Sequence, residues 1–547
     1  MKRMWKLKNN MSGGILDVLF ANRGLTIAED IGNFLDPKFE HVHDPLLMRD
    51  IDLAIARIQK AMEQNQKITV YADYDADAVT AAAVLLRFFQ HLDYKNIEYY
   101  IPDRFSEGYG MNVEAVREIA ARGTNLIITV DCGINAFDSV LEGSALGVDT
   151  IITDHHQLTG GIPAAIAVVN PHRPDDSYPF KHLTGVGVAF KLVQALTKDS
   201  WQKWLLDLVA IGTVADCQSL LGENRILVKW GLHVMQKTRW IGLKKLMQIA
   251  GIEKGEIDTY QIGFIIAPRI NAAGRLEHAG IALELLLTDD ETKASELAEK
   301  LNDLNTRRQK LTEQIVSEAR EQVVSLGDKK ILLAAGDGWP KGIVGLVAGK
   351  LTEEFARPVL VLEKSADQAT GSARSIANFN IIEAISQSSE ILMRFGGHPQ
   401  AAGFTLRAEH IDLFHKNLLD YAEANLSEES LEPVLHYEAE LTTQQVSGEL
   451  VDLLQKFEPY GQDNQRPRFR INNLRVSAVS AVGQEGKHLR LRLESLAAIG
   501  FGMGYWVAKL QPGSRVDVIC EPQFNEWNGE KSVQLKIIDL HETDNLH

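Results

Sequence analysis

An acidic turn between a short apolar strand and a helix constrains this chain most. Within residues 67–92 (KITVYADYDADAVTAAAVLLRFFQHL), Ile68–Tyr71 is apolar and β-rich, and Val79–Leu92 has helical periodicity. Such a strand–turn–helix places the turn at the carboxyl edge of an α/β sheet, where open folds of this class bind ligands. The turn carries three carboxylates, Asp73, Asp75 and Asp77.

Carboxylates at this density repel one another, and the following helix N-terminus offers only about half a positive charge. We therefore expect a divalent cation among them. An EF-hand is excluded, because its sixth position is Ala78 where glycine is needed and its twelfth is Val84 where glutamate is needed.

Further polar residues follow other predicted elements in a region that alternates strands and helices from Lys67 to about Asp216. This alternation predicts a doubly wound parallel sheet. The predicted strands are 125–130, 149–153 and 165–169, and a helix at 204–214 follows them. The residues directly after these elements include Asp131, Asp154, His155, His156 and Asp216. Carboxyl ends of parallel strands share one edge, so we expect these side chains to meet the acidic turn there.

This residue set suits a hard divalent metal. Carboxylates with one or two imidazoles favour Mn²⁺ or Mg²⁺, and histidine tilts the choice towards Mn²⁺. The acids exceed what one ion uses, so two ions about 3.5–4 Å apart are expected to clamp a phosphoryl group and activate water. No Walker loop occurs, so nucleotide-triphosphate chemistry is not indicated.

A long polar helix and a second α/β unit follow a mostly helical stretch at residues 217–285. The helix is predicted over Thr288–Leu326, a span of roughly 55–60 Å, which is long enough to link two lobes. Strands are predicted at 331–335 and 358–362. Two small-residue stretches, GSARS at 371–375 and GGHPQAAG at 396–403, have exposed amides that suit an anionic ligand.

The segment from about Val434 changes character. Lys487–Leu493 alternates with period two, and Asn528-Gly529 is a hairpin signal, so short strands of a small barrel or sandwich are expected. Residues 466–492 carry six arginines and one lysine against one glutamate. With Phe469 and Trp527 as stacking faces, this pattern fits single-stranded nucleic acid, and it fits a solvated basic face equally well. The candidate DNA-binding arginines are Arg466, Arg468, Arg470, Arg490 and Arg492.

Bulk composition limits the remaining classes of protein. The chain has 547 residues, a net charge of −16 and three cysteines, which predicts several domains in a reducing cytoplasm. No apolar run reaches the roughly 18 residues of a membrane span, and no signal peptide is predicted. We expect no membrane partner, and we find no oligomerisation signal.

The ordered motifs resemble the DHH phosphoesterase superfamily. The acidic turn, Asp131-Cys132-Gly133, Asp154-His155-His156 and Asp216 match its N-terminal domain, and GGHPQAAG resembles its associated C-terminal domain. IPDRFSEGYGMN at 101–112, NAAGRL at 271–276 and GSARSI at 371–376 narrow the resemblance to the bacterial RecJ family of exonucleases.

The resemblance implies an α/β fold in three parts: a DHH-type doubly wound parallel-sheet domain, a DHH-associated α/β domain joined to it by a long helix, and a C-terminal oligonucleotide-binding (OB) β-barrel. The expected boundaries are 1–66 for a helical lead-in, 67–285, 286–329, 330–433 and 434–547.

The resemblance also implies a 5′→3′ exonuclease that hydrolyses single-stranded DNA to 5′-mononucleotides in repair and recombination. A single-strand-binding protein and a helicase are expected partners. By similarity, the catalytic residues are Asp75, Asp77, Asp131, His155 and His156. The implied metal ligands are Asp73, Asp75, Asp77, Asp131, Asp154, His155 and Asp216. The implied DNA and phosphate contacts are Arg104, Tyr109, Arg275, Ser372, Arg374, Gly397 and His398.

Three residues depart from the family pattern. Ala72 and Ala78 stand where glycines are usual, and Pro340 stands where histidine is common. Ala78 would be strained only in a left-handed conformation.

Three other functions remain as alternatives. The main one is a DHH oligoribonuclease or cyclic-dinucleotide phosphodiesterase, which typically lacks the C-terminal module. A non-catalytic binding protein is disfavoured by the intact acids. A pyrophosphatase would need a histidine at Tyr71.

Overall fold

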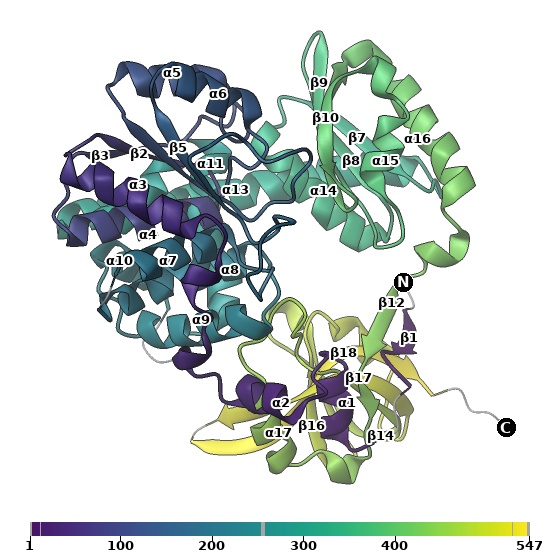
Figure 1. Ribbon diagram of the computed structural model, residues 1–547. Helices are drawn as coiled ribbons and strands as arrows, with labels where there is room; N and C mark the ends of the chain where they lie inside the picture. The colour runs from purple at the N-terminus through teal and green to yellow at the C-terminus, as the bar shows by residue number, and fades with distance from the viewer. Residues whose placement is uncertain (1–2, 11–12, 198, 253–256, 528, 544–547) are drawn as a thin grey trace. The chain divides into compact units, whose positions relative to one another are not determined.

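The computed structural model describes residues 3–10, 13–197, 199–252, 257–527 and 529–543 (Figure 1). It divides into two compact units, which are described separately. The larger comprises Val42–Gln218 and Trp230–Pro433, and the smaller comprises Met1–His41, Ser219–Lys229 and Val434–His547. Among the described residues, no helix has the length and apolar character needed to cross a membrane.

The larger unit contains the predicted parallel sheet, with strand order β3-β2-β4-β5-β6. The apolar runs form its buried centre, where Val70 aligns with Ile128 and Ile128 with Ile151. The edge strand β3 was not predicted, because its half-exposed sequence IEYY lacks a continuous apolar run. The strands are β2 (Ile68–Ala72), β3 (Ile97–Tyr100), β4 (Leu126–Val130), β5 (Asp149–Thr153) and β6 (Ala167–Val169).

Helices cover both faces of this sheet (Figure 1). The helix after the acidic turn, α4 (Ala76–His91), is buried on nearly all sides and packs against α7 (Gly185–Leu196) and α8 (Leu206–Ala215). Its Ala-rich sequence allows this close approach. The other helices between residues 51 and 287 are α3 (Ile51–Glu63), α5 (Val113–Ala121), α6 (Phe137–Ala145), α9 (Gly222–Met235), whose residues up to Lys229 belong to the smaller unit, α10 (Ile241–Ile249), the π-helical turn η4 (Gln261–Ile266), α11 (Ala267–Leu276) and α12 (Gly280–Leu287).

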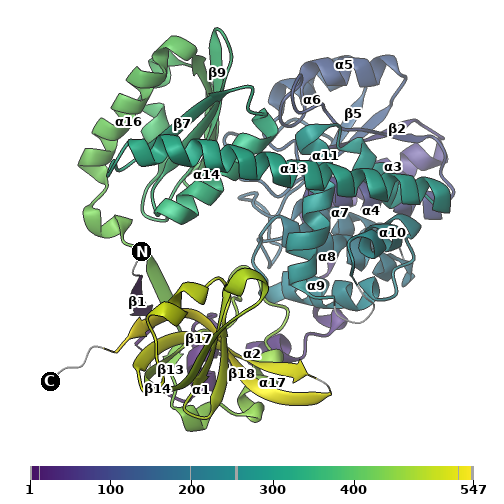
Figure 2. The ribbon, with the colours of Figure 1, turned by 180° about the vertical axis from the view of Figure 1, so that it is seen from behind.

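The predicted long helix is confirmed as α13 (Glu291–Ser325), which Figure 2 shows from the side. Its 35 residues span about 52 Å. One part packs against α10, α11 and α12, and another packs against α14 (Lys341–Phe355) and β7 (Leu332–Asp337). It therefore joins the two α/β lobes of the larger unit.

The second lobe is a five-stranded sheet in the order β10-β11-β9-β8-β7, in which only β7 and β8 pair in parallel. Most residues of both glycine-rich stretches lie in its strands, with Pro399 and Gln400 in the turn between β10 and β11. Gly371 is required on β9, since an added Cβ would lie 2.4 Å from Cζ of Phe404. The other strands are β8 (Val359–Lys364), β9 (Gln368–Arg374), β10 (Leu392–His398) and β11 (Ala401–Arg407), and α15 (Ile381–Ser386) and α16 (Ile411–Asn425) complete the lobe.

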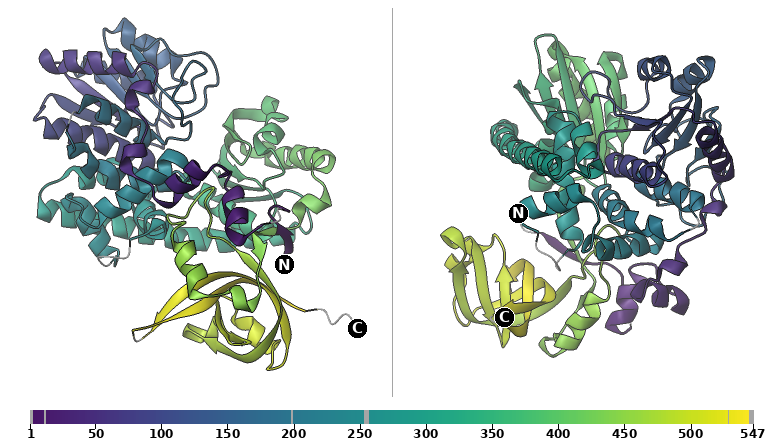
Figure 3. Two further views of the ribbon diagram at one scale, coloured as in Figure 1. Left: turned by 60° about the horizontal axis from the view of Figure 1, so that its bottom comes forward. Right: turned by 90° about the vertical axis from the view of Figure 1, so that its left-hand side faces the viewer.

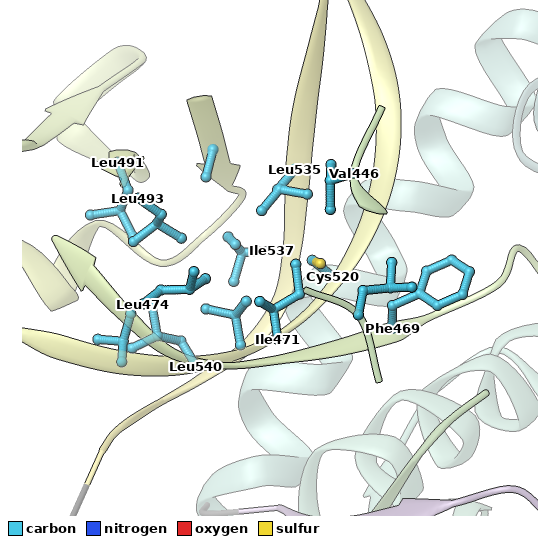
Figure 4. Packing of buried hydrophobic residues seen from close by; sticks show 14 of the residues in the cluster. Val446, Phe469, Ile471, Leu474, Leu491, Leu493, Cys520, Leu535, Ile537 and Leu540 are labelled. Carbon is cyan, nitrogen blue, oxygen red and sulfur yellow. The ribbon is translucent and has the colours of Figure 1, made fainter. Parts of the chain in front are cut away.

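The smaller unit contains a closed β-barrel, which confirms the predicted OB fold (Figure 3). The pairing of β14 with β17 closes the sheet. Figure 4 shows part of its core, which includes the buried side chains of Phe469, Leu491 and Leu535. The predicted hairpin is β17–β18, paired from Val516↔Glu542 to Trp527↔Glu530, while Asn528 and the Trp527 side chain lie outside the described residues. The barrel strands are β14 (Phe469–Val482), β15 (His488–Leu493), β16 (Leu496–Gly500), β17 (Arg515–Trp527) and β18 (Glu530–Glu542).

The N-terminal segment of the chain packs onto this barrel and belongs to the same unit. β1 (Met4–Leu7) pairs in parallel with β12 (Val434–Tyr437). The helices α1 (Ile15–Ala21) and α2 (Ala28–Leu35) contribute their apolar faces to the barrel core. The N-terminal segment was expected to be helical only, so the strand β1 is a difference. The domain boundaries given above remain predictions.

Candidate metal centre and phosphate site

The acidic turn begins where β2 ends. Asp73 is 2% exposed, and its Oδ1 accepts no hydrogen bond from any described residue. Asp75 is the N-cap of α4, where its Oδ1 accepts from the amides of Asp77 and Ala78 at 3.0 and 3.1 Å. The alternating carboxylates therefore divide between the sheet edge and the first turn of the helix.

Asp77 points away from solvent towards α7. Its two carboxylate oxygens accept from the amides of Gly185 and Val186 at 2.7 and 2.9 Å. Small residues make this packing possible, because a Cβ on Gly212 would lie 2.6 Å from Asp77 Oδ1 and one on Gly185 would lie 2.4 Å from Asp131 Cβ. The carboxylates of Asp77 and Asp131 are thus held against a glycine-lined wall.

His155 lies at the centre of the cluster, just after the end of β5. Its Nε2 is 3.0 Å from Asp131, 3.8 Å from Asp77 and 3.7 Å from Asp216. Two groups have ligand atoms close enough to share an ion: Asp77, His155 and Asp216, and Asp131, His155 and His156. These groups are therefore positioned to bind metal.

His156 is oriented by its neighbours. Its Nδ1 lies 2.7 Å from Oδ1 of Asp154, and its Nε2 lies 3.1 Å from the hydroxyl of Tyr109. The carboxylate of Asp154 also accepts from the amides of His155, His156 and Ile134. Asp154 is thus engaged by protein donors and holds the His156 ring at the edge of the cluster.

The electrostatics of these acids fit a cation. Burial raises the pKa of Asp73 to about 8, with a further contribution from Asp75. Burial, and to a lesser extent repulsion from Asp131 and Asp216, raises the pKa of Asp77 well above its usual value. Burial and repulsion from Asp75 likewise raise the pKa of Asp131 well above its usual value. A divalent ion would remove the repulsion that protein groups leave uncompensated. The buried Oδ1 of Asp73, which accepts no hydrogen bond from a described residue, also fits a bound cation.

Arginines gather beside the acidic turn. Nη1 of Arg275 donates to the carbonyl of Gly342 at 3.0 Å. Burial lowers the pKa of Arg275 to about 9, with repulsion from Arg104, Arg308 and Arg374 acting in the same direction. Mutually repelling guanidinium groups indicate a site for an anion such as phosphate.

The second lobe brings the other predicted phosphate contacts together. Arg374 donates to the hydroxyl of Ser372 at 3.0 Å, and both lie on β9. On the adjoining hairpin, Gly397 pairs with Ala402 and His398 with Ala401, while Ala401 also aligns with Arg374 on β9. Strand pairing therefore assembles separated sequence motifs on one sheet.

Aromatic rings connect the phosphate site with the metal cluster. The guanidinium of Arg104 lies 4.7 Å from the ring centre of Tyr74, and Tyr74 makes an edge contact with Tyr109. Tyr109 in turn reaches His156. The segment IPDRFSEGYGMN thus lies beside the candidate metal centre.

The five candidate DNA-binding arginines of the barrel fall into two groups. Arg466, Arg468 and Arg470 lie within 4 Å of carboxylates, namely Glu458, Glu521, Glu440 and Asp517. Arg490 and Arg492 are exposed on β15, and no described carboxylate pairs with them. Of these five arginines, the two on β15 therefore carry positive charge that no described carboxylate offsets.

Sequence reasoning missed several residues of the site. One is Arg308, which belongs to the polar helix α13. Another is Arg394 on β10, whose Nη2 lies near Gly108 and which belongs to no recognised motif. Asn271 lies within the NAAGRL motif, but its hydrogen bond to the acidic turn joins distant segments. The sequence contains no local signal for these contacts.

Comparison with known proteins agrees with this architecture. The DHH family N-terminal domain matches residues 67–213, the DHHA1 domain matches 328–424, and the RecJ OB domain matches 437–539. The single-stranded-DNA-specific exonuclease RecJ of Escherichia coli K12 is 31% identical over 96% of this chain and 95% of its own. This chain belongs to the RecJ family.

Other RecJ proteins support the assignment. RecJ of Bacillus subtilis is 40% identical over 528 residues, which cover 95% of this chain and 67% of that protein. The crystal structure of Thermus thermophilus RecJ in complex with Mn²⁺ superposes with a TM-score of 0.84 at 31% identity, covering 96% of this chain and 76% of that one. The same protein has also been solved with Mg²⁺.

The departures from the RecJ pattern create no backbone strain. Ala72 ends β2 and Ala78 lies in the first turn of α4, and neither has a positive φ. Pro340 is the N-cap of α14 with φ −60°, which proline adopts readily.

Proposed function

We propose that this protein is a divalent-metal-dependent exonuclease that hydrolyses single-stranded DNA from the 5′ end and releases 5′-mononucleotides. The observation that carries the proposal is the convergence of Asp77, Asp131, Asp216 and His155 at one sheet edge, in a chain of the RecJ family. The 5′→3′ direction and the mononucleotide product are expectations from that family.

We assign the metal-binding role to Asp77, Asp131, His155 and Asp216, with Asp75 and Asp73 on the same turn. Bound Mn²⁺ or Mg²⁺ would lower the pKa of a coordinated water and stabilise charge on the phosphoryl oxygens. The glycine-lined wall and the amides of Gly185 and Val186 hold Asp77 in one orientation before substrate arrives. Asp154 fixes the His156 ring, whose Nε2 stays directed at Tyr109.

We assign recognition of the terminal phosphate to Arg275, Arg374 and Ser372, with Arg104, Gly397 and His398 beside them. A phosphate would relieve the repulsion among the arginines, and their planar forks suit its oxygens. A terminal phosphate held beside the metal-binding residues would present the first phosphodiester for cleavage. The 5′ polarity itself is expected from the RecJ family.

We further infer that the DNA-binding face of the barrel is β15 and β16 with the turn that follows. No described carboxylate pairs with Arg490 or Arg492 there, and Phe501 and Tyr505 are 58% and 61% exposed. Exposed aromatic faces with adjoining cations suit stacked bases and a phosphate backbone. Arg466, Arg468 and Arg470 are expected to contribute less, because nearby carboxylates already offset their charge.

The alternative of an oligoribonuclease or cyclic-dinucleotide phosphodiesterase is not favoured, because the chain contains the RecJ OB domain as well as both DHH-type domains. We expect a cytoplasmic location, consistent with three cysteines that form no disulfide. A single-strand-binding protein and a helicase remain the partners expected from the family.

Digestion of end-blocked DNA tests the proposal. One oligonucleotide is blocked at its 5′ end and an identical one at its 3′ end, and each is incubated with Mn²⁺ and the protein. Protection by the 5′ block alone is the expected result. Protection by the 3′ block alone would overturn the polarity. Rapid cleavage of dinucleotides with little attack on longer DNA would favour the small-substrate phosphodiesterases.

A further inference from the structure

Asn271 connects the acidic turn to the helix that carries Arg275. It lies on α11, and its Oδ1 accepts a hydrogen bond from the backbone amide of Ala76 at 2.9 Å. Ala76 is the first residue of α4, between Asp75 and Asp77. Asn271 is therefore bonded to the backbone of the turn that presents two candidate metal ligands.

This bond satisfies an amide that the helix itself leaves without a partner. The first amides of a helix have no intrahelical acceptor. Asp75 accepts from the amides of Asp77 and Ala78, and Asn271 accepts from that of Ala76. One carboxylate oxygen of Asp75 is thus used within the turn, and Asn271 supplies the acceptor that Asp75 does not.

The same face of α11 makes two more close contacts. Gly274 lies one turn further along, and a Cβ there would be 2.6 Å from the carbonyl oxygen of Tyr74. Arg275 follows, with its guanidinium on the carbonyl of Gly342. Positions i, i+3 and i+4 share one side of a helix, so Asn271, Gly274 and Arg275 form a continuous contact surface.

We propose that Asn271 is a positioning residue for the metal-binding turn, and that α11 ties this turn to the phosphate-binding Arg275. The proposal rests on the function proposed above and adds a residue to it. Among the described residues, no hydrogen bond joins Asn271 to the carboxylate or imidazole of a candidate metal ligand. Asn271 acts through the Ala76 amide, which fixes the directions in which the carboxylates of Asp75 and Asp77 leave the backbone.

A merely structural role predicts a different result. If Asn271 only stabilised α11, its loss would lower thermal stability and leave metal affinity unchanged. Alanine is the most favourable residue in a helix, so Asn271→Ala is expected to fold. Loss of an outer-sphere partner of a metal ligand typically costs about 10–100-fold in metal affinity or activity. We therefore expect weaker Mn²⁺ binding without a matching loss of fold.

Calorimetric titration of the full-length protein with Mn²⁺ alone tests this inference. Asn271→Ala is expected to weaken Mn²⁺ binding by about 10-fold. Asn271→Asp keeps an oxygen acceptor of nearly the same shape and should bind Mn²⁺ within about threefold of the parent. The control is Asp290→Ala, which removes the N-cap bond to the Lys293 amide at the start of α13.

Steady-state kinetics give a second readout. With saturating Mn²⁺, Asn271→Ala should lower kcat while leaving KM for single-stranded DNA within about twofold, because the phosphate contacts remain. Parental Mn²⁺ affinity in a folded Asn271→Ala protein would overturn the proposal, as would an equal loss in Asp290→Ala. If the parent itself bound no Mn²⁺, the proposed function would fail with it.

Discussion

Nε2 of His155 lies 3.0 Å from Oδ1 of Asp131 across the carboxyl edge of the parallel sheet. The two residues follow β5 and β4, which are adjacent strands in register. Asp131 has φ +58°, a left-handed conformation that turns its carboxylate towards His155. Asp and Asn tolerate this conformation better than most residues. The backbone thus fixes the orientation of a candidate ligand before any ion binds.

This geometry provides a clean test of the metal centre. Asp131→Asn keeps the left-handed backbone and the side-chain shape but removes the negative charge. We expect cleavage of single-stranded DNA to fall by at least about 100-fold, since even outer-sphere losses cost about 10–100-fold. DNA binding, measured by fluorescence anisotropy without metal, should be unchanged. Asp93→Asn is the matched control, because Asp93 is exposed and has φ +55°. Full cleavage by Asp131→Asn would refute the assignment.

The barrel surface predicts a difference between two arginine pairs. Replacing Arg490 and Arg492 by alanine should weaken binding of single-stranded DNA. It should also reduce the slope of log K against log salt by about 1.4, since each phosphate neutralised on a single strand contributes about 0.7. Replacing Arg468 and Arg470 should change the slope less, because Glu521 and Asp517 already neutralise them. Equal slopes for the two double variants would show that ion pairs with carboxylates do not determine which of these arginines bind DNA.

The sequence predicted the parallel sheet and its acidic edge because their signals are local. The buried strands are rich in apolar residues, and the polar residues of the edge closely follow them, except Asp216, which follows α8. Parallel pairing then requires that these ends meet. The same logic located Asp131 and His155 without a structure.

Contacts between distant segments gave no such signal. Asn271 meets Ala76, and Arg308 approaches Arg275, only because α11 packs between α4 and α13. The glycine-rich stretches have a composition typical of anion-binding turns. Most of their residues instead pair as strands of one sheet, where Phe404 packs at the place that a Cβ of Gly371 would occupy. Arg468 forms an ion pair with Glu521, whereas no described carboxylate pairs with Arg490. Both arginines belong to the same basic segment, so the sequence alone does not show this difference.

Asp207 is predicted to give the larger unit a pH-dependent stability. It is buried on α8, and its carboxylate accepts from Thr238 Oγ1 at 2.5 Å and from Trp240 Nε1 at 3.0 Å. Burial raises its pKa to about 6, although these hydrogen bonds oppose the shift. The unfolded carboxyl titrates near 3.9. The folded state therefore binds more protons between these values, and stability falls as the pH rises from about 4 to about 6.

Thermal unfolding at pH 4.5 and pH 7.5 in EDTA measures this effect. Asp207→Asn cannot ionise, so its melting temperature should decrease less than that of the parent between the two pH values. The full contribution of the shift is at most about 3 kcal/mol. Asp138→Asn, which alters an exposed acid in the first turn of α6, should follow the parent. If the melting temperature of Asp207→Asn changed with pH as much as that of the parent, Asp207 would not be the cause of the pH dependence.

Arg225 is predicted to hold the smaller unit together. It is 1% exposed, and its guanidinium donates to five backbone carbonyls. One of these belongs to Phe34, whose ring lies 3.8 Å from the guanidinium carbon. The other four carbonyls are those of Lys456, Phe457, Glu458 and Pro459. A single side chain thus joins the N-terminal helices to the segment that leads into the barrel.

Arg225→Met should leave these carbonyls buried without donors. Each unsatisfied group costs about 1–3 kcal/mol, so we expect the unit to lose at least about 3 kcal/mol of stability. Arg225→Lys should be intermediate, because an ammonium has fewer donors and no planar fork. Lys229→Met, one turn further along α9, is the control and should have little effect. Proteolysis within residues 434–543 should accelerate in Arg225→Met alone. Resistance equal to the parent would mean that the apolar core of the barrel, with Phe34 packed into it, is sufficient.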